Sequence, residues 1–123
     1  MGLPIATTGG GICFAFPDVC STQVGPATIP VPYPNIGFLK DAKGVSTNVH
    51  VAGNPVILKN SNIPKTTGDE PGNPSCGLVE FTSSSNSVKV NGQFVVRMTD
   101  TTRQNSGNAL GVVLGGVSNV LCG

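Results

Sequence analysis

Four cysteines and one histidine are the residues of this 123-residue chain whose side chains could bind a metal ion. Thiolate and imidazole ligands together suit a tetrahedral zinc site, although no Cys-x-x-Cys pair supplies the usual local chelate. The spacing of Cys13 and Cys20 is not diagnostic, so a site would be assembled from separate strands, for example from His50, Cys76 and Cys122. The sequence therefore allows one zinc ion held by these three residues, or none.

Catalysis by the polar residues is a weaker interpretation. A Ser or Cys nucleophile needs a nearby base, and His50 is the single imidazole; a lone histidine in a Val-His-Val strand pattern is more often a surface or packing residue. Asp69 and Glu70 are adjacent, so on an extended chain they point to opposite sides and cannot flank one bond. Residues 8–11, Thr-Gly-Gly-Gly, do not complete a phosphate-binding motif. We expect no enzyme, with a small Cys/His hydrolase as a minor alternative.

Charge and hydropathy exclude several classes of partner. The net charge is +1, and the seven Lys and Arg residues are scattered singly, so no basic stripe for nucleic acid is present. The longest apolar stretch, Ala109 to Leu121, is interrupted by glycines and polar residues and is too short to anchor the chain in a bilayer. The N-terminal residues lack the pattern of a Sec signal, so reduced cysteines in a cytosol are expected.

The elements that must position these residues are strands and turns. With 17 glycines and 10 prolines and few helix-forming runs, the composition favours one all-β domain over residues 1–123. Residues 16–37 are expected to form an extended, stiff strap that packs on the body, because proline fixes φ and removes backbone donors. The prolines of this strap are Pro17, Pro26, Pro30, Pro32 and Pro34.

The remaining chain repeats itself. Residues 49–58 align with residues 88–97 at a spacing of 39, and Gly68 aligns with Gly107 at the same spacing. In each copy a Val-x-Val alternation precedes Ala52-Gly53 or Asn91-Gly92, and a second apolar run follows. Asn-Gly is a strong hairpin signal, so the sequence predicts two β-hairpins. Residues 112–114 and 117–121 are candidates for further short strands.

Several of these segments resemble the PAAR-like domain family over nearly the whole chain. The segments are Phe16 to Cys20, Val31 to Asn35, Gly68-Asp69-Glu70, and Gln104 to Asn108. The Pro-Ala-Ala-Arg motif of that family follows a hairpin glycine; here the corresponding residues are 55–58 and 94–97, and only Arg97 keeps the charge. The family positions in this sequence are Pro17, Asp18, Cys20, Pro32, Tyr33, Pro34, Asn35, Gly53, Gly68, Asp69, Gly92 and Arg97.

The resemblance implies a small cone-shaped β domain with a pseudo-threefold arrangement, in which the two hairpins and the proline-rich strap supply the three sectors. It implies a structural tip that caps the trimeric VgrG-type spike of a type VI secretion or related contractile injection system, one tip per trimer, with effectors as further partners. Such a tip is assembled in the bacterial cytoplasm and then expelled. Family members often hold a zinc ion near the apex through several His and one Cys, a pattern from which this chain, with one His, departs.

A disulfide-stabilised, secreted β adhesion module is the alternative from another class of protein. Its support is the presence of four cysteines together with polar loops rich in Ser, Thr and Asn. Free thiols would count against it.

Overall fold

The computed structural model describes residues 2–68 and 77–123, and the regular secondary structure of these residues is almost entirely β. The all-β prediction is therefore confirmed; η1 (Leu39–Asp41) is a single 3-10 turn. No helix in the described part of the chain has the length and apolar character needed to cross a membrane. The strands are β1 (Leu3–Ile5), β2 (Ile12–Val24), β3 (Ala27–Phe38), β4 (His50–Val51), β5 (Asn54–Pro55), β6 (Asn62–Ile63), β7 (Val79–Phe81), β8 (Lys89–Val90), β9 (Gln93–Phe94), β10 (Thr101–Gln104), β11 (Ala109–Leu114) and β12 (Val117–Cys122).

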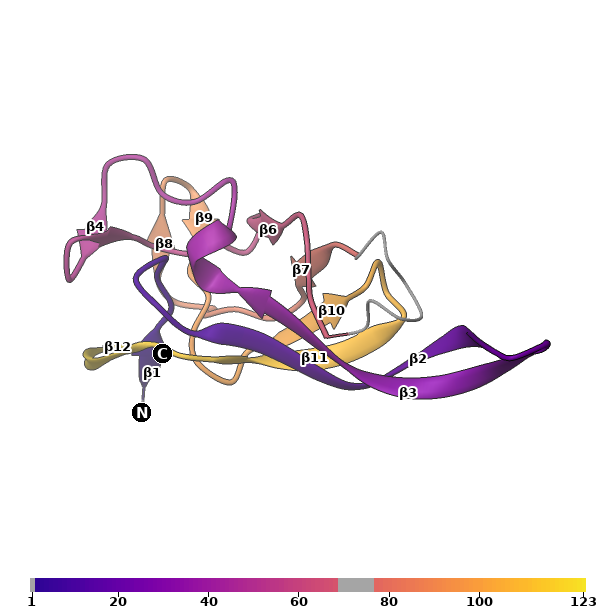
Figure 1. Cartoon of the computed structure of the whole chain (residues 1–123). Helices are drawn as coiled ribbons and strands as arrows, with labels where there is room; N and C mark the ends of the chain where they lie inside the picture. Colours follow the sequence, from indigo (N-terminus) through magenta and orange to yellow (C-terminus); the bar gives the residue numbers. More distant parts are fainter. Residues whose placement is uncertain (1, 69–76) are drawn as a thin grey trace.

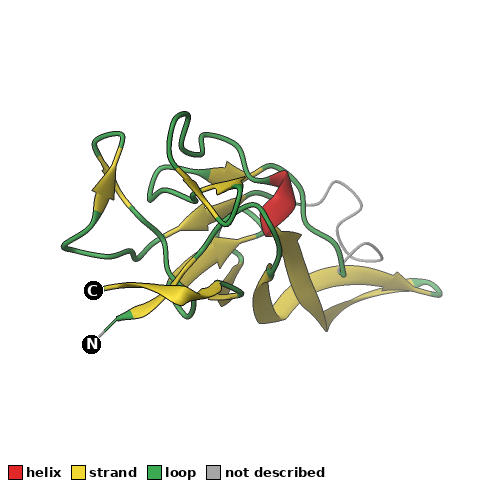
Figure 2. Cartoon of the chain, turned by 90° about the vertical axis from the view of Figure 1, so that its left-hand side faces the viewer, coloured by secondary structure: helices red, strands yellow, loops and turns green. Residues whose placement is uncertain are grey.

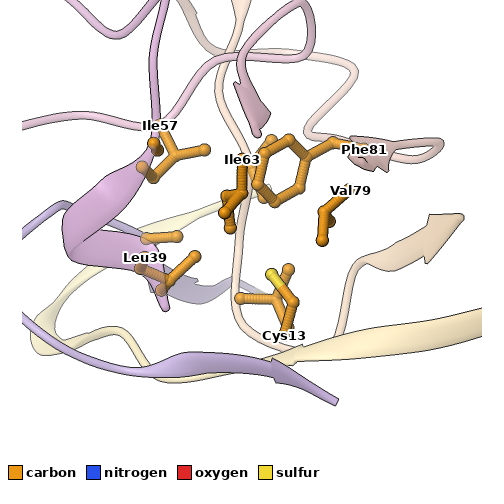
Figure 3. Packing of buried hydrophobic residues seen from close by; sticks show 10 residues of the cluster. Cys13, Leu39, Ile57, Ile63, Val79 and Phe81 are labelled. Atoms are coloured by element: carbon orange, nitrogen blue, oxygen red, sulfur yellow. The ribbon is translucent and has the colours of Figure 1, made fainter. Parts of the chain in front are cut away.

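An antiparallel sheet with the strand order β3-β2-β11-β10-β7-β6 forms the body. Its inner face carries the main apolar core, because alternate residues of each strand point to the same side. In Figure 3 the side chains of Cys13, Leu39, Ile57, Ile63 and Phe81 converge in this core. The core thus joins the sheet to η1 and to residues of the repeated segments.

The expectation that the proline-rich segment forms a strap packed on the body is wrong. The segment reverses at Gly25, which has a φ of 59°, and pairs with itself as the long antiparallel hairpin β2–β3. The outer half of this hairpin projects from the body as a two-stranded arm (Figure 1). Its apolar residues Val24 and Ile29 are 51% and 42% exposed, so they do not anchor it. Extension was predicted correctly; the reversal was not.

The prolines of β3 protect an open sheet edge. β3 is one of the two edge strands of this sheet, and Pro30, Pro32 and Pro34 occupy alternate positions along it. Proline is tolerated at an edge, where its missing N–H does not interrupt the ladder, and it discourages pairing with another chain. The arm is consequently stiff and poorly suited to strand addition along β3.

Both predicted hairpins are present. β4 pairs with β5 and β8 pairs with β9, with His50 opposite Pro55 and Lys89 opposite Phe94. The turn residues have positive φ angles, 53° and 81° at Ala52 and Gly53, and 51° and 79° at Asn91 and Gly92. Two consecutive positive φ angles identify type I′ turns, whose twist matches that of the flanking strands.

A third hairpin of the same kind is formed by the two ends of the chain. β12 pairs with β1, and Leu121 lies opposite Pro4 as His50 lies opposite Pro55. Gly123 and Gly2 therefore occupy the positions that turn residues hold in the other two hairpins. Figure 2 shows the two chain ends side by side. The third sector is this hairpin and not the proline-rich segment, which corrects the earlier assignment.

A cycle of backbone hydrogen bonds links the three repeats. The Ala6 N–H donates to the Val96 carbonyl at 2.9 Å, and the Val96 N–H donates to the Ile57 carbonyl at 2.9 Å. The Ile57 N–H donates back to the Ala6 carbonyl at 3.0 Å, which closes the cycle. Three equivalent bonds in a closed cycle indicate an approximate threefold axis that runs between these residues. A second cycle repeats the pattern: Thr8 to Pro55, Lys59 to Phe94, and Met98 to Pro4, at 2.8–3.0 Å.

Candidate docking surface

The three hairpins β4–β5, β8–β9 and β12–β1 enclose a second apolar cluster, and we call this side of the domain the hairpin end. The cluster contains the buried residues Ile5, Val56, Leu58, Val95 and Cys122. The sheet packs on the opposite side of the hydrogen-bonded cycle, and its strand order has no threefold repeat. The hairpin end is therefore where the approximate threefold symmetry reaches the surface.

The surface of the hairpin end is mixed in character and carries little charge. His50, Lys89 and Leu121 occupy equivalent positions on the three hairpins, and all three are exposed. The Lys89 ammonium lies 4.7 Å from the centre of the Phe94 ring, where the ring face attracts a cation. The symmetry is thus one of backbone, while the side chains differ from sector to sector.

Arg97, the one charged residue kept from the Pro-Ala-Ala-Arg motif, is held by the fold. Its Nη2 lies 2.8 Å from Oδ1 of Asp100, and its backbone N–H and Nε donate to Oδ2 of the same carboxylate. The side-chain hydrogen bond to Asp100 raises the pKa of Arg97. Asp100 is only 3% exposed, so Arg97 neutralises a buried charge within the domain.

The three residues considered for zinc are not brought together by the described parts of the chain. His50 lies exposed on β4 and Cys122 is buried on β12, in different sectors, while Cys76 lies outside the described residues. Within residues 2–68 and 77–123, no three His, Cys, Asp or Glu side chains are grouped as a metal site requires. Burial raises the pKa of the Cys122 thiol, and the charge of Arg97 offsets only part of this rise. The thiol is therefore protonated near neutral pH, and a protonated thiol is a poor metal ligand. A site involving Cys76 stays a prediction.

The thiols also bear on the disulfide alternative. Cys13 and Cys122 are free and buried. Burial raises the pKa of Cys13 to about 12, so this thiol is protonated and unreactive near neutral pH. A framework of two disulfides, as the adhesion hypothesis requires, does not fit these two residues.

A buried polar cluster unites three of the motif segments. Asp18 is fully buried, and its carboxylate accepts hydrogen bonds from the side-chain amides of Asn35, Asn105 and Asn108. Gln104, also fully buried, donates to the Asn35 side chain and to the Cys13 carbonyl. This cluster fastens the base of the β2–β3 hairpin to the β10–β11 turn, so the motif residues have a structural role. The resemblance already included Gln104, but its buried contacts with Asn35 and Cys13 have no signal in the sequence.

The comparison with known protein families decides the classification. The sequence model of the Toxin PAAR-like domain family matches residues 11–111. The chain belongs to this family. The match includes both complete hairpins and the polar cluster, while β1 and β12 of the third hairpin lie outside it.

The PAAR-like domain is also similar to a curated protein, the DNase toxin Tse7 of Pseudomonas aeruginosa. The two are 37% identical over 119 residues, which cover 85% of this chain and 31% of the toxin. The chain thus spans less than a third of the length of this relative. No solved structure matches the chain.

The remaining motif positions of the PAAR-like domain can be placed individually. The Tyr33 hydroxyl lies 2.7 Å from Thr22 Oγ1 across the arm, and Cys20 lies 3.9 Å from the Asn105 amide. Gly68 has a φ of 105°, and a Cβ there would lie 2.6 Å from the Pro34 carbonyl oxygen, so glycine is needed at this close approach. Asp69 lies outside the described residues.

The outer face of the sheet in the PAAR-like domain is apolar over β11, β2 and β3. Val112, Phe14 and Ile36 form one row across these strands. Leu110 is 74% exposed and Phe16 is 58% exposed on the same strands. This face is a second exposed surface, but it lacks the threefold repeat of the hairpin end.

Proposed function

We propose that this PAAR-like domain caps the trimeric VgrG-type spike of a type VI secretion system or a related contractile injection system, with the hairpin end as the docking surface. The observation that carries the proposal is the closed cycle of hydrogen bonds among Ala6, Ile57 and Val96. A single chain that repeats its backbone three times about an axis matches a threefold-symmetric partner without the need for three copies. The stoichiometry is then one domain per trimer.

Capping also solves a physical problem of the partner. A trimeric β-helix ends in unpaired backbone groups and an open apolar interior, which favour uncontrolled association unless they are covered. The hairpin end offers three short strand pairs and exposed apolar side chains such as Leu121, which is 58% exposed. The stiff hairpins and the proline-rich arm suit a part that is driven through a membrane after assembly in the bacterial cytoplasm.

The experiment that tests this proposal is co-purification with the trimeric spike of the source organism. Gel filtration with light scattering should give one complex of three spike chains and one domain. A variant with a bulky charge on the docking surface, Leu121→Glu, should lose the complex. The matched control is Leu110→Glu on the sheet face, which should keep it.

The DNase toxin relative suggests a second role, the delivery of a toxin. The match covers only 31% of that protein, so most of the toxin has no counterpart in the 123 residues of this chain. We propose that the PAAR-like domain itself is not catalytic and that it carries effectors, whether joined to it or bound. Incubation of the purified chain with plasmid DNA and Mg²⁺ should leave the DNA intact; cleavage that survives rigorous purification would assign nuclease activity to this domain.

A zinc ion remains part of the proposal only through Cys76. Elemental analysis of the purified protein and of a Cys76→Ser variant tests it. One zinc per wild-type chain, lost in the variant, would establish the ion, and zinc-free wild-type protein would remove it.

A further inference from the structure

The ring of hairpins contains three equivalent junctions, at each of which one hairpin turn meets the loop that leads into the neighbouring hairpin. In the first junction the turn residue Asn91 reaches the loop before β4. Its Nδ2 donates to Asn48 Oδ1 at 2.8 Å, and the Thr47 N–H donates to its Oδ1 at 3.2 Å. The Asn91 carboxamide therefore closes this junction by donating one hydrogen bond and accepting another.

The second junction is closed as well, by a backbone carbonyl. Gly123 occupies the turn position of the third hairpin and meets the loop before β8. The Ser85 hydroxyl donates to the Gly123 carbonyl. Ser87 Oγ lies 3.0 Å from the place where a Cβ at Gly123 would stand, so little space is left.

The third junction is open. Ala52 has the backbone conformation of Asn91, with φ angles of 53° and 51°, but it has no carboxamide. Asn119, the counterpart of Asn48, is exposed and makes no side-chain hydrogen bond to the described chain. Next to Ala52, a cavity of about 300 Å³ lies between β4–β5 and the segment before β12. It is lined by Thr7, Ala52, Asn54, Val117 and two glycine segments, 9–11 and 115–116.

The walls of this cavity are neutral and rich in peptide groups. Gly11 and Gly115 approach so closely that a Cβ on Gly115 would lie 2.6 Å from the Gly11 Cα. The two glycine segments therefore expose backbone where side chains would otherwise fill the space. No lining residue is charged, so the cavity favours a neutral group that can both donate and accept hydrogen bonds.

We propose that the open junction binds one Asn or Gln carboxamide from a terminal loop of the trimeric spike. This inference rests on the proposed docking of the hairpin end. The chemistry is taken from the first junction, where the carboxamide of Asn91, the turn residue equivalent to Ala52, joins the turn to the neighbouring loop. Of three identical spike loops, one meets the open junction and two meet closed ones, so the docked complex is asymmetric although the spike is not.

The variant Ala52→Asn tests this inference because it restores the residue found at the equivalent turn. Asn is compatible with the positive φ, as Asn91 shows, so the variant should fold, and its own carboxamide should occupy the junction. The dissociation constant for the trimeric spike, measured by calorimetry, should rise about tenfold, the typical effect of one lost carboxamide interaction. The melting temperature should rise at the same time.

Two matched controls separate occupation of the cavity from damage to the docking surface. Thr28→Asn places the same carboxamide on an exposed residue of the arm, outside the hairpin end, and should bind the spike within about twofold of the wild type. Asn91→Ala removes the clamp at the first junction and should lower the melting temperature, which shows what one carboxamide contributes to a junction. Equal affinity of Ala52→Asn and the wild type would overturn this inference alone, whereas a wild-type chain that does not bind the spike would overturn the proposed function with it.

Discussion

Pro4 lies opposite Leu121 in the register of β1 and β12, so the first and last strands of the chain build a hairpin equivalent to the two that are continuous in sequence. The approximate threefold symmetry therefore passes through the chain ends. The chain ends can therefore be moved from the turn of the third hairpin to the turn of another hairpin.

A circular permutant should fold. Joining Gly123 to Gly2, with Met1 omitted, would give the third hairpin a two-residue turn, and new ends between Ala52 and Gly53 would open the first hairpin at its exposed turn. We expect a melting temperature within a few degrees of the wild type, because no residue of the hydrogen-bonded cycle is disturbed. New ends between Val95 and Val96 should instead abolish cooperative unfolding. A permutant opened at Ala52 that fails to fold would contradict the assigned symmetry.

Ile57 joins the symmetric cycle to the main core. It is fully buried, and both its backbone N–H and its carbonyl belong to the cycle. Ile57→Ala should lower the free energy of unfolding by about 2–5 kcal/mol, the usual cost of a large core truncation. Urea denaturation measures it, and Leu121→Ala, at a side chain that is 58% exposed, is the control with an expected change below about 0.5 kcal/mol.

The Asp18 carboxylate organises the polar cluster by accepting from three carboxamides. Asp18→Asn replaces one acceptor oxygen with a donor that would face other donors. We expect a loss of about 2–4 kcal/mol in the free energy of unfolding, because buried polar groups are left without partners. Thr28→Ala, at an exposed residue of the arm, should change little. An Asp18→Asn protein as stable as the wild type would show that the cluster is not what holds the arm.

Cys13 should make stability decrease at alkaline pH. Burial raises its pKa from 9.0 to about 12, so the folded chain holds this proton more tightly than the unfolded chain does. The resulting stabilisation is complete below about pH 9 and is lost as the pH rises toward the folded-state value. Urea denaturation between about pH 8 and pH 10 should show a downward slope that is smaller in Cys13→Ala. Equal slopes would contradict a protonated, buried thiol.

The sequence predicted the elements whose form depends on local backbone conformation. Ala52-Gly53 and Asn91-Gly92 require positive φ angles between alternating apolar residues, and both hairpins are present. The third hairpin escaped prediction because its strands stand at opposite ends of the chain and no continuous pattern joins Leu3 to Cys122. The prolines predicted extension correctly, but the pairing of β2 with β3 depends on a reversal at a two-residue turn, Gly25-Pro26.

The residues of the family motif could be predicted from the sequence, but their contacts could not. The motif residues from Phe16 to Cys20 and from Gln104 to Asn108 were recognised, but their role as one buried cluster depends on contacts between Asp18 and Asn105 that no spacing reveals. The open junction depends on a comparison of Ala52 with Asn91 within a symmetry that is visible only in three dimensions.

The most direct test of the account is the mass of the complex between this PAAR-like domain and the trimeric spike. Light scattering on the gel-filtration peak should give three spike chains to one domain, with the complex lost in Leu121→Glu and kept in Leu110→Glu. Separate elution of the two proteins at micromolar concentration, or a complex with three domains per trimer, would contradict the claim that one chain presents a threefold docking surface.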